Sequence, residues 1–594
     1  METDKIQKGG EFLIKETEAK DIFIPEEINE EQRMIVQTCE DFLEAEVFPI
    51  LERIDSQEDG LMRELIRKSG DLGLLGISLP EEYDGFDQSF VTSMLASHAM
   101  GAGYSFSVAY SAHTGIGTLP ILYYGNEEQK KKYIPKLASG EWAASYCLTE
   151  PNAGSDANSG KTKAVLSEDG KYYILNGQKM WITNGGFADV HTVFAKIDND
   201  RILSAFIVES NWDGVVINPE EKKMGIKGSS TVQIFYNDVK VPVGNLLGKR
   251  GQGFRIALNI LHMGRIKLGG TVLGAAERAI TQSVNYANER KQFGRFISSF
   301  GAIKFKLAEQ VIRTFSTESA VYRVSQNIDE AIERLVEEGI PKSKATIEGI
   351  AQYAIEAALL KVYGSEILNY VVDEAVQIFG GMGFSAETSV DRAYRDSRIN
   401  RIFEGTNEIN RLLVADTTIK KALKSGFDVV RYANHIIKDL DEKPDDETTE
   451  LSYYEEKRKY IKNFKKTVLL LLGAVSEKFE RKLVEEQEIL FNVSDIIIQI
   501  YAAESTLLRI EKSESMKGEE YIKIYKDILD IFVYDAANII HKAALDAISS
   551  FTEGDEQKIL LDRINMFTKV APVNVKEARR RIADKLIDDN RYNF

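Results

Sequence analysis

The sequence predicts a mostly helical α+β protein, in which a β domain lies between two helical regions and a further helical region follows. Apolar residues recur at helical spacing before residue 142 and after residue 253, whereas residues 143–247 are short β-branched and aromatic segments. A chain of 594 residues is also too long for one hydrophobic core and should form roughly three to five domain-sized units. The predicted divisions are 1–30, 31–142, 143–247, 248–415 and 416–594.

The first helical region is indicated by apolar positions such as Ile35, Cys39 and Phe42, which share one helix face. In the β region, Lys163–Leu166 and Tyr172–Leu175 flank Glu168-Asp-Gly-Lys171, a typical hairpin turn. Further strands are expected near 190–195, 203–208, 215–217 and 232–241, and strands at this spacing favour a small β-barrel or sandwich.

The glycine-rich segment Gly248–Gly253 leads into the second helical region. It lacks the strand–turn–helix context of a dinucleotide-binding unit, so we interpret it as a linker turn. The last region contains an acidic break, Asp439–Glu450, that is typical of an exposed linker. Its segment from Phe491 resembles the segment from Phe305, either as a degenerate duplication or because amphipathic helices look alike.

Composition excludes several classes of function. The net charge of −17 argues against general nucleic-acid binding, which needs a basic face. Cys39 and Cys147 are too few for a disulfide framework, and the six histidines have no metal-ligand spacing, so no metal site is expected. The N-terminus has no apolar signal core, and the longest apolar run, 468–475, is too short to span a bilayer. A cytoplasmic protein is expected.

The segment 401–409, Arg-Ile-Phe-Glu-Gly-Thr-Asn-Glu-Ile, places a carboxylate, Glu404, directly before a glycine. Glycine lets a ligand approach the main chain closely, and burial would raise the pKa of the carboxylate towards neutrality. Glu404 is therefore a candidate general base. The alternative is a helix cap, in which Thr406 or Asn407 satisfies free amides.

Four sequence motifs in a fixed order indicate the function. They are Tyr146-Cys-Leu-Thr-Glu-Pro-Asn-Ala-Gly-Ser-Asp156, Trp181-Ile-Thr-Asn-Gly185, Arg290-Lys-Gln-Phe-Gly294, and Gln377-Ile-Phe-Gly-Gly381 followed by Glu404-Gly-Thr406. Together they resemble the FAD-dependent acyl-CoA dehydrogenase family over residues 31–415. The C-terminal extension and Met263-Gly-Arg265 narrow the resemblance to the very-long-chain branch.

The resemblance implies a C-terminal four-helix bundle and FAD as cofactor, which would accept a hydride that no side chain can take. Trp181 alone would also fit a core aromatic of the β domain. In the family, part of the FAD site comes from a neighbouring subunit, so at least a dimer is implied. The positions that the resemblance assigns to FAD are Tyr146, Leu148, Thr149, Ser155, Trp181, Ile182, Thr183, Arg290, Gln292, Phe293, Phe300, Gln377, Gly380, Gly381, Thr406 and Glu408.

The resemblance also assigns the catalytic base to Glu404. Some family members carry the base instead at the position of Gly264, which has no side chain here. Ser155, His262, Arg265 and Gly405 match substrate-binding positions, although His262 departs from the usual residue type and a packing role is an alternative. Val108 and Ala112 stand where medium-chain relatives have larger polar side chains, which favours long acyl chains.

The implied function is dehydrogenation of a fatty acyl-CoA to the trans-2-enoyl-CoA in β-oxidation, with electrons passed to an electron-transfer flavoprotein. Very-long-chain relatives are homodimers, so a homodimer is expected. Alternatives are an acyl-CoA oxidase and a non-catalytic assembly role; a DNA-associated flavoprotein is disfavoured by the acidic charge. Lysine-rich 417–424 and 457–466 suggest at most weak peripheral membrane contact, or simply solvated helix faces.

Overall fold

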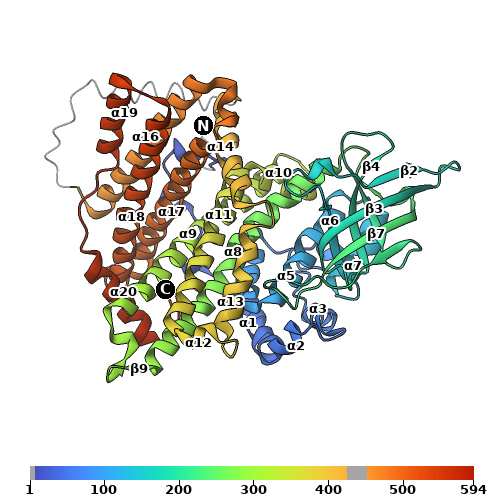
Figure 1. The fold of residues 1–594 in the computed structure, drawn as a ribbon, viewed down its shortest axis with the longest axis horizontal. Helices are drawn as coiled ribbons and strands as arrows, with labels where there is room; N and C mark the ends of the chain where they lie inside the picture. The colour runs from blue at the N-terminus through green and yellow to red at the C-terminus, as the bar shows by residue number, and fades with distance from the viewer. Residues whose placement is uncertain (1–6, 425–450) are drawn as a thin grey trace.

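A computed structural model of the protein describes residues 7–424 and 451–594. It has the predicted order of a helical, a β, a second helical and a further helical region (Figure 1). The predicted linker Asp439–Glu450 lies outside the described residues. Within the described part of the chain, no helix is long and apolar enough to cross a membrane.

The N-terminal helices start at well-defined caps. At the beginning of α1 the Asn29 side chain accepts a hydrogen bond from the Gln32 N–H at 2.8 Å, and Asn126 does the same for Gln129 at α7. These caps account for where the helices begin. The helices are α1 (Glu30–Phe42), α2 (Leu51–Asp55), α3 (Leu61–Asp71), α4 (Phe90–Met100), α5 (Ser105–Ser111), α6 (Leu119–Tyr124) and α7 (Glu127–Ala138).

The β domain is one eight-stranded sheet in the order β6-β7-β3-β2-β4-β5-β8, with β1 paired to β4. The predicted hairpin is confirmed as the antiparallel pair of β2 and β3. Ladder irregularities interrupt the pairing of β3 with β7 between Lys179 and Ile182, where the sheet passes the candidate site. The strands are β1 (Ala144–Cys147), β2 (Lys163–Leu166), β3 (Tyr172–Thr183), β4 (Val190–Ile197), β5 (Ser204–Glu209), β6 (Val215–Ile217), β7 (Thr231–Pro242) and β8 (Leu246–Leu247).

Long helices α8 and α11 pack closely together and carry the second helical region. The glycine-rich segment 248–253 is a turn before α8, as expected, and the Gly253 N–H donates to the carbonyl of Leu203 at 2.7 Å. A short hairpin separates α8 from α9. The elements are α8 (Gly253–Glu289), β9 (Lys291–Gln292), β10 (Arg295–Phe296), α9 (Gly301–Glu337), α10 (Lys342–Gln352), α11 (Ala354–Phe379), α12 (Gly381–Phe384), α13 (Ser389–Ser397) and α14 (Asn407–Lys424).

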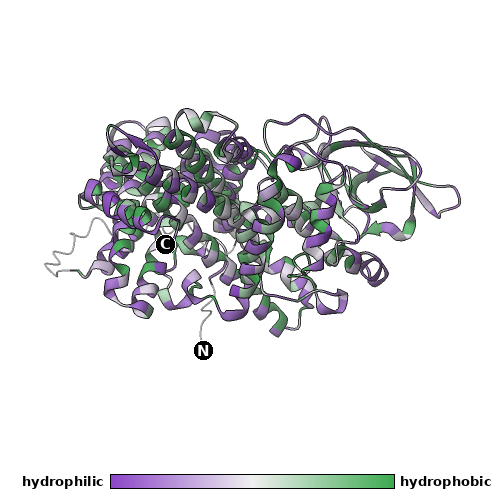
Figure 2. Cartoon of the chain, turned by 90° about the horizontal axis from the view of Figure 1, so that it is seen from below, coloured by the Kyte–Doolittle hydropathy of each residue, from purple (hydrophilic) through white to green (hydrophobic). Residues whose placement is uncertain are grey.

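The C-terminal region packs onto the second helical region through α17, which contacts α9, α11 and α14. Its apolar residues belong to the same core cluster as those of α8, α9 and α11, and hydrophobic stretches gather where these helices face one another (Figure 2). Arg323 of α9 and Glu504 of α17 form a buried ion pair at 2.9 Å. The region is therefore fused to the bundle rather than tethered beside it. Its helices are α16 (Tyr453–Phe479), α17 (Gln487–Lys517), α18 (Glu519–Phe551), α19 (Gly554–Phe567) and α20 (Val575–Asp589).

The lysine-rich stretch on α16 is largely engaged within the protein. Lys457 forms an ion pair with Asp530 at 2.9 Å, and Lys465 pairs with Glu504; both lysines are buried. A buried lysine cannot reach a membrane surface, so these two do not support peripheral membrane contact. The side chains of 422–424, part of the other stretch, lie outside the described residues.

Candidate functional site

Glu404 stands on a turn between η12 (Arg398–Arg401) and α14, and its backbone is left-handed, with φ of 58°. Such a conformation is uncommon for a residue other than glycine and persists only where its surroundings hold it. Here the Glu404 carbonyl accepts hydrogen bonds from the Arg265 Nε at 3.0 Å and the Asn410 side chain at 3.4 Å. The turn is therefore held from α8 and from α14.

The helix-cap alternative is resolved by the neighbouring residues. The Thr406 hydroxyl accepts a hydrogen bond from the Ile409 N–H at 3.3 Å and so caps α14. Glu404 takes no part in the cap, because its Oε2 is buried and has no hydrogen-bond partner. Burial raises the pKa of the Glu404 carboxyl to about 7, although Arg265 and Lys361 oppose the shift. A carboxylate with this pKa can take a proton at neutral pH.

Gly264 faces the same carboxyl group from α8. A Cβ at this position would lie 2.9 Å from both Cδ and Oε2 of Glu404. The absence of a side chain at 264 therefore leaves the space in which the Glu404 carboxyl sits.

Arg265 is buried in the next position of α8, and its NH1 lies 3.5 Å from the His262 Nδ1. Burial and the Arg265 charge lower the pKa of His262 to about 4, so the imidazole is neutral at physiological pH. A neutral imidazole can donate or accept a hydrogen bond beside the turn, but it is not a cation there. Gly405 has a φ of +85°, which favours glycine, and a Cβ at this position would lie 3.4 Å from the Arg265 NH2.

The β domain contributes a second group of predicted residues. Tyr146 and Leu148 are buried at the end of β1, and the carbonyl of Thr149 accepts from the Met180 N–H at 2.9 Å. The Tyr146 hydroxyl is buried and has no hydrogen-bond partner. Burial raises the pKa of this phenol well above its usual value, and the nearby Glu404 carboxylate raises it further. Tyr146 therefore lies on the Glu404 side of the β domain.

Trp181 is 62% exposed and has a φ of 55°, so it is not the core aromatic that its residue type alone allowed. Its neighbour Ile182 points inward and is buried, whereas Thr183 is half-buried and pairs with Thr231 of β7. An indole held in the open at a strained position has the shape to cover a flat aromatic ligand.

Sequence reasoning missed two buried lysines at this site. The Lys179 ammonium donates to the Leu148 carbonyl at 3.2 Å and pairs with Glu150 at 2.7 Å, which fixes the Leu-Thr-Glu string against β3. Lys361 on α11 is fully buried near Glu404. Lys361 stands between the apolar residues Leu360 and Val362, a signal that could have pointed to it, since lysines are almost never buried without a partner. Lys179 stands between Gln178 and Met180 and gives no such signal.

The remaining predicted FAD residues form a separate, exposed group at the other end of the bundle. Arg290, Gln292 and Phe293 lie on and beside the β9–β10 hairpin, and the Phe293 ring is 91% exposed. Tyr286 stacks on Phe379 with ring centroids 4.1 Å apart, which brings this hairpin next to the end of α11. That end carries Gln377, Gly380 and Gly381, all of them exposed.

Figure 1 shows β9 and α12 far from β3, so one chain does not bring this exposed group to Trp181. Phe300 is half-buried and stays with the hairpin, because the Arg295 guanidinium lies 3.9 Å above its ring. Ser155 and Glu408 are both exposed. The Glu408 carboxylate is stabilised by its own backbone N–H and by Thr406, which lower its pKa, so it is not a competing base.

One group in the described part of the chain has the composition of a metal site: His98, Glu277 and Glu318. Its ligand atoms are already engaged. His98 contacts the Tyr322 hydroxyl and Glu277, each at 2.9 Å, and Glu318 pairs with Arg509 at 2.6 Å. We interpret the group as a buried ion network that joins α4, α8, α9 and α17.

Comparison with family models accounts for most of the chain. The models described as acyl-CoA dehydrogenase N-terminal, middle and C-terminal domains match residues 29–141, 145–239 and 251–419. A further model, also described as an acyl-CoA dehydrogenase C-terminal domain, matches residues 463–565.

Individual relatives agree with these matches. A probable acyl-CoA dehydrogenase of Bacillus subtilis is 44% identical over 99% of this chain and 98% of its own length. The human mitochondrial very long-chain specific enzyme is 43% identical over 58% of this chain and 51% of its own length, so the aligned part is about half of that relative.

Two solved structures are similar as well. The crystal structure of an acyl-CoA dehydrogenase from Bacillus anthracis complexed with FAD has a TM-score of 0.96 and 44% identity, and covers 99% of this chain and 100% of that one. The butyryl-CoA dehydrogenase of Megasphaera elsdenii has a TM-score of 0.58 and 34% identity over 66% of this chain and 98% of that one.

Proposed function

Because this chain belongs to the acyl-CoA dehydrogenase family, we propose that it oxidises the Cα–Cβ bond of a fatty acyl-CoA to the trans-2-enoyl-CoA, with Glu404 as the base. The observation that carries the proposal is the Glu404 carboxyl, which is held on a left-handed turn, has a buried oxygen without a partner, and has a pKa of about 7. Such a group removes a proton at neutral pH without first breaking another hydrogen bond.

The α-proton of a thioester is weakly acidic, so the carbonyl oxygen needs hydrogen bonds as charge develops on it. Arg265 and Asn410 hold the carbonyl of Glu404. Its N–H has no acceptor among the residues that the structure describes, which leaves this donor for the thioester oxygen. Arg265, His262, Gly405 and Ser155 are the proposed substrate-binding residues around it.

The residues of the β domain fit a flavin. Trp181 offers an exposed indole, with the Leu148–Thr149 string hydrogen-bonded beside it. The chemistry that FAD supplies when bound is acceptance of the β-hydride. We propose that Tyr146, Leu148, Thr149, Ser155, Trp181, Ile182, Thr183, Thr406 and Glu408 contact the cofactor from this chain.

The exposed group at the hairpin and the end of α11 is proposed to complete the FAD site of a second copy of the chain. It offers a cation at Arg290, an amide at Gln292, and an exposed ring at Phe293. These are suitable partners for a pyrophosphate and an adenine. A homodimer, a cytoplasmic location and an electron-transfer flavoprotein as acceptor remain part of the proposal.

The preference for long acyl chains is supported by the space around Val108. This residue lines a small cavity of about 60 Å³ between α5, α8 and α11, together with Thr271, Leu368 and Val372. Ala112 follows one turn later and is also small. Additional volume beside the acyl path admits a longer tail.

The test is an anaerobic titration of the purified FAD-loaded protein with acyl-CoAs of graded length, following bleaching of the flavin. We expect the wild type to bleach and Glu404→Gln to bleach about a thousandfold more slowly, because general-base removal typically costs this much. A wild type that no acyl-CoA bleaches would contradict the dehydrogenation. Bleaching of Glu404→Gln at the wild-type rate would contradict the base assignment. Rapid reoxidation by oxygen would indicate an oxidase instead.

A further inference from the structure

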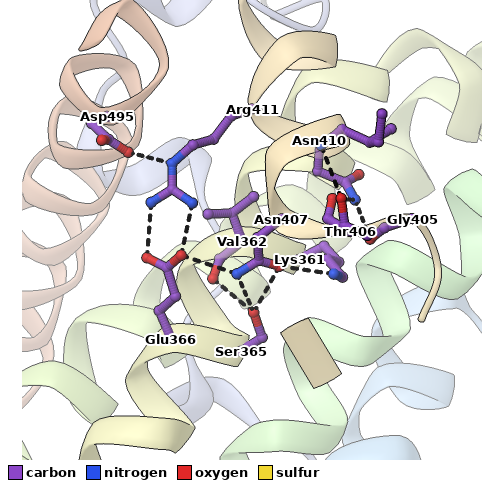
Figure 3. A network of polar contacts seen from close by, with 11 residues as sticks. Lys361, Val362, Ser365, Glu366, Gly405, Thr406, Asn407, Asn410, Arg411 and Asp495 are labelled. Atoms are coloured by element: carbon purple, nitrogen blue, oxygen red, sulfur yellow. Dashed lines mark hydrogen bonds and ion pairs between the residues drawn. The ribbon is translucent and has the colours of Figure 1, made fainter. Parts of the chain in front are cut away.

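A continuous set of polar contacts joins the C-terminal region to the turn that carries Glu404 (Figure 3). At its outer end, Asp495 of α17 accepts a hydrogen bond from the Arg411 Nε at 2.7 Å. The other two nitrogens of Arg411 bind both oxygens of Glu366 on α11, at 2.7 and 2.9 Å. Arg411 therefore connects three helices with its five-donor fork.

The inner end of this polar chain is Asn407, the first residue of α14 and three residues from Glu404. Its Nδ2 donates to Glu366 and to the Ser365 hydroxyl, each at 3.0 Å, and its Oδ1 accepts from the Lys361 ammonium at 2.8 Å. Asn407 is buried and uses both ends of its amide. Such a fully used amide has one orientation, so it fixes where α14 begins.

Lys361 is fully buried, and within the described ranges 7–424 and 451–594 it forms no ion pair. Lys361 therefore interacts with the nearby carboxylates by electrostatic attraction without direct contact. Burial lowers the pKa of Lys361 to about 7, and Glu404 is the largest opposing influence. The charged groups that face it are Glu404, Arg265, Glu408 and Glu366. Lys361 is thus a buried amine beside the proposed base, and its positive charge is disfavoured by burial and favoured by Glu404.

The C-terminal region holds α14 at two adjacent points. Asp495 binds the Arg411 side chain, and the hydroxyl of Ser494 donates to the Arg411 carbonyl at 2.6 Å. The side chains of Arg411 and Asp495 are 17% and 36% exposed, so their attraction is only partly screened by water. Two contacts on one residue restrict both the rotation and the sliding of α14 against α17.

We propose that Lys361 and Asn407 are positioning residues for Glu404, and that α17 keeps them in place through Asp495, Ser494 and Arg411. The C-terminal region then determines the geometry of an active site to which it contributes no reacting group. This inference depends on the proposed role of Glu404.

The test uses the full-length FAD-loaded protein and hexadecanoyl-CoA, and measures the rate of anaerobic flavin bleaching against pH. Asp495→Ala should lower the rate at saturating substrate about tenfold with KM unchanged, because small displacements of a reacting group are costly. Asp495→Glu should restore most of the rate. Lys361→Met should move the acid limb of the profile up by about one pH unit, since a nearby cation favours the carboxylate, and Lys361→Arg should return it.

Asp584→Asn is the matched control. Asp584 of α20 pairs with Lys304 of α9, so it also joins the C-terminal region to the bundle, but α14 takes no part in that pair. We expect Asp584→Asn to bleach at the wild-type rate. FAD absorbance and the thermal midpoint identify any variant that loses its fold. If Lys361→Met does not fold, the rates of the Asp495 variants alone test the inference.

Two results would overturn the inference: wild-type rates in Asp495→Ala, or an equal loss of rate in Asp584→Asn. If the acid limb of the pH profile is unchanged in a folded Lys361→Met protein, Lys361 does not position Glu404. These failures differ from failure of the proposed function, in which the wild type itself does not bleach.

Discussion

The Glu404 turn and the β9–β10 hairpin both carry motif residues, yet their surroundings are opposite. The turn is half-buried and presents a buried carboxyl oxygen, and Arg265, Asn410 and the capped start of α14 determine its shape. The hairpin and the neighbouring end of α11 are exposed, with Phe293 at 91%. A proton-transfer group gains its pKa from burial within its own chain, whereas a cofactor-binding surface can stay open until a ligand or a second subunit covers it. The comparison predicts different consequences of mutation at the two places.

Among changes that keep Glu404 itself, the largest expected effect comes from filling the space beside the turn. Gly264→Ala would place a methyl group 2.9 Å from the Glu404 carboxyl and displace it, with about a hundredfold loss of bleaching rate. Gly269→Ala on the same helix is the control, because its Cβ would meet only the Val321 side chain at 3.2 Å and Leu360 beyond it. If both variants bleach equally fast, the space beside Glu404 is not required.

The pH dependence of the bleaching rate should report the pKa of Glu404. Burial raises the pKa of Glu404 to about 7, and only the carboxylate takes a proton. The bleaching rate should therefore fall as the pH is lowered through 7, by about tenfold for each further pH unit. Stopped-flow measurements from pH 5.5 to 9 would check this. A rate that is flat down to pH 5.5 would contradict the raised pKa.

Changes on the exposed surface should affect cofactor retention and leave the base unaltered. Arg290→Ala removes a cation proposed for the FAD of a second copy, and should raise the Kd for FAD about tenfold, the loss of roughly one charge-assisted hydrogen bond. Lys291→Ala is the neighbouring control, since its ammonium already lies 4.5 Å from the Phe296 ring. The acid limb of the pH profile should not move. If Arg290→Ala retains FAD but shifts that limb, the hairpin also influences the base, and the proposed difference between the two regions is wrong.

The smallest effect is expected along the acyl path. Val108→Gln would reduce the space beside the cavity between α5 and α8, and should lower the rate with C16 relative to C8 acyl-CoA about fourfold, the value of roughly one buried methylene. Rates with C4 to C8 substrates serve as the internal control. An unchanged C16-to-C8 ratio would exclude Val108 from chain-length selection.

Much of the fold could be predicted because its signals are local. The hairpin turn at Glu168–Lys171, the linker at Gly248–Gly253 and the order of helical and β regions depend on period and turn residues, and all are confirmed. The family assignment is confirmed as well. The fusion of the C-terminal region with the bundle could not be predicted, since it depends on contacts such as Arg323 with Glu504, which are far apart in the sequence.

The sequence by itself determined the family and the candidate base, because short motifs in fixed order carry that information, and it showed that Gly264 brings no rival carboxylate. Only the tertiary structure decided that the Glu404 carboxyl has a buried oxygen without a hydrogen-bond partner, that Gly264 borders this carboxyl, and that Lys361 lies near it. The physical reason is that a pKa and a packing contact depend on what surrounds a group in space. Residues 264, 361 and 404 become neighbours only when α8, α11 and the turn before α14 are packed together.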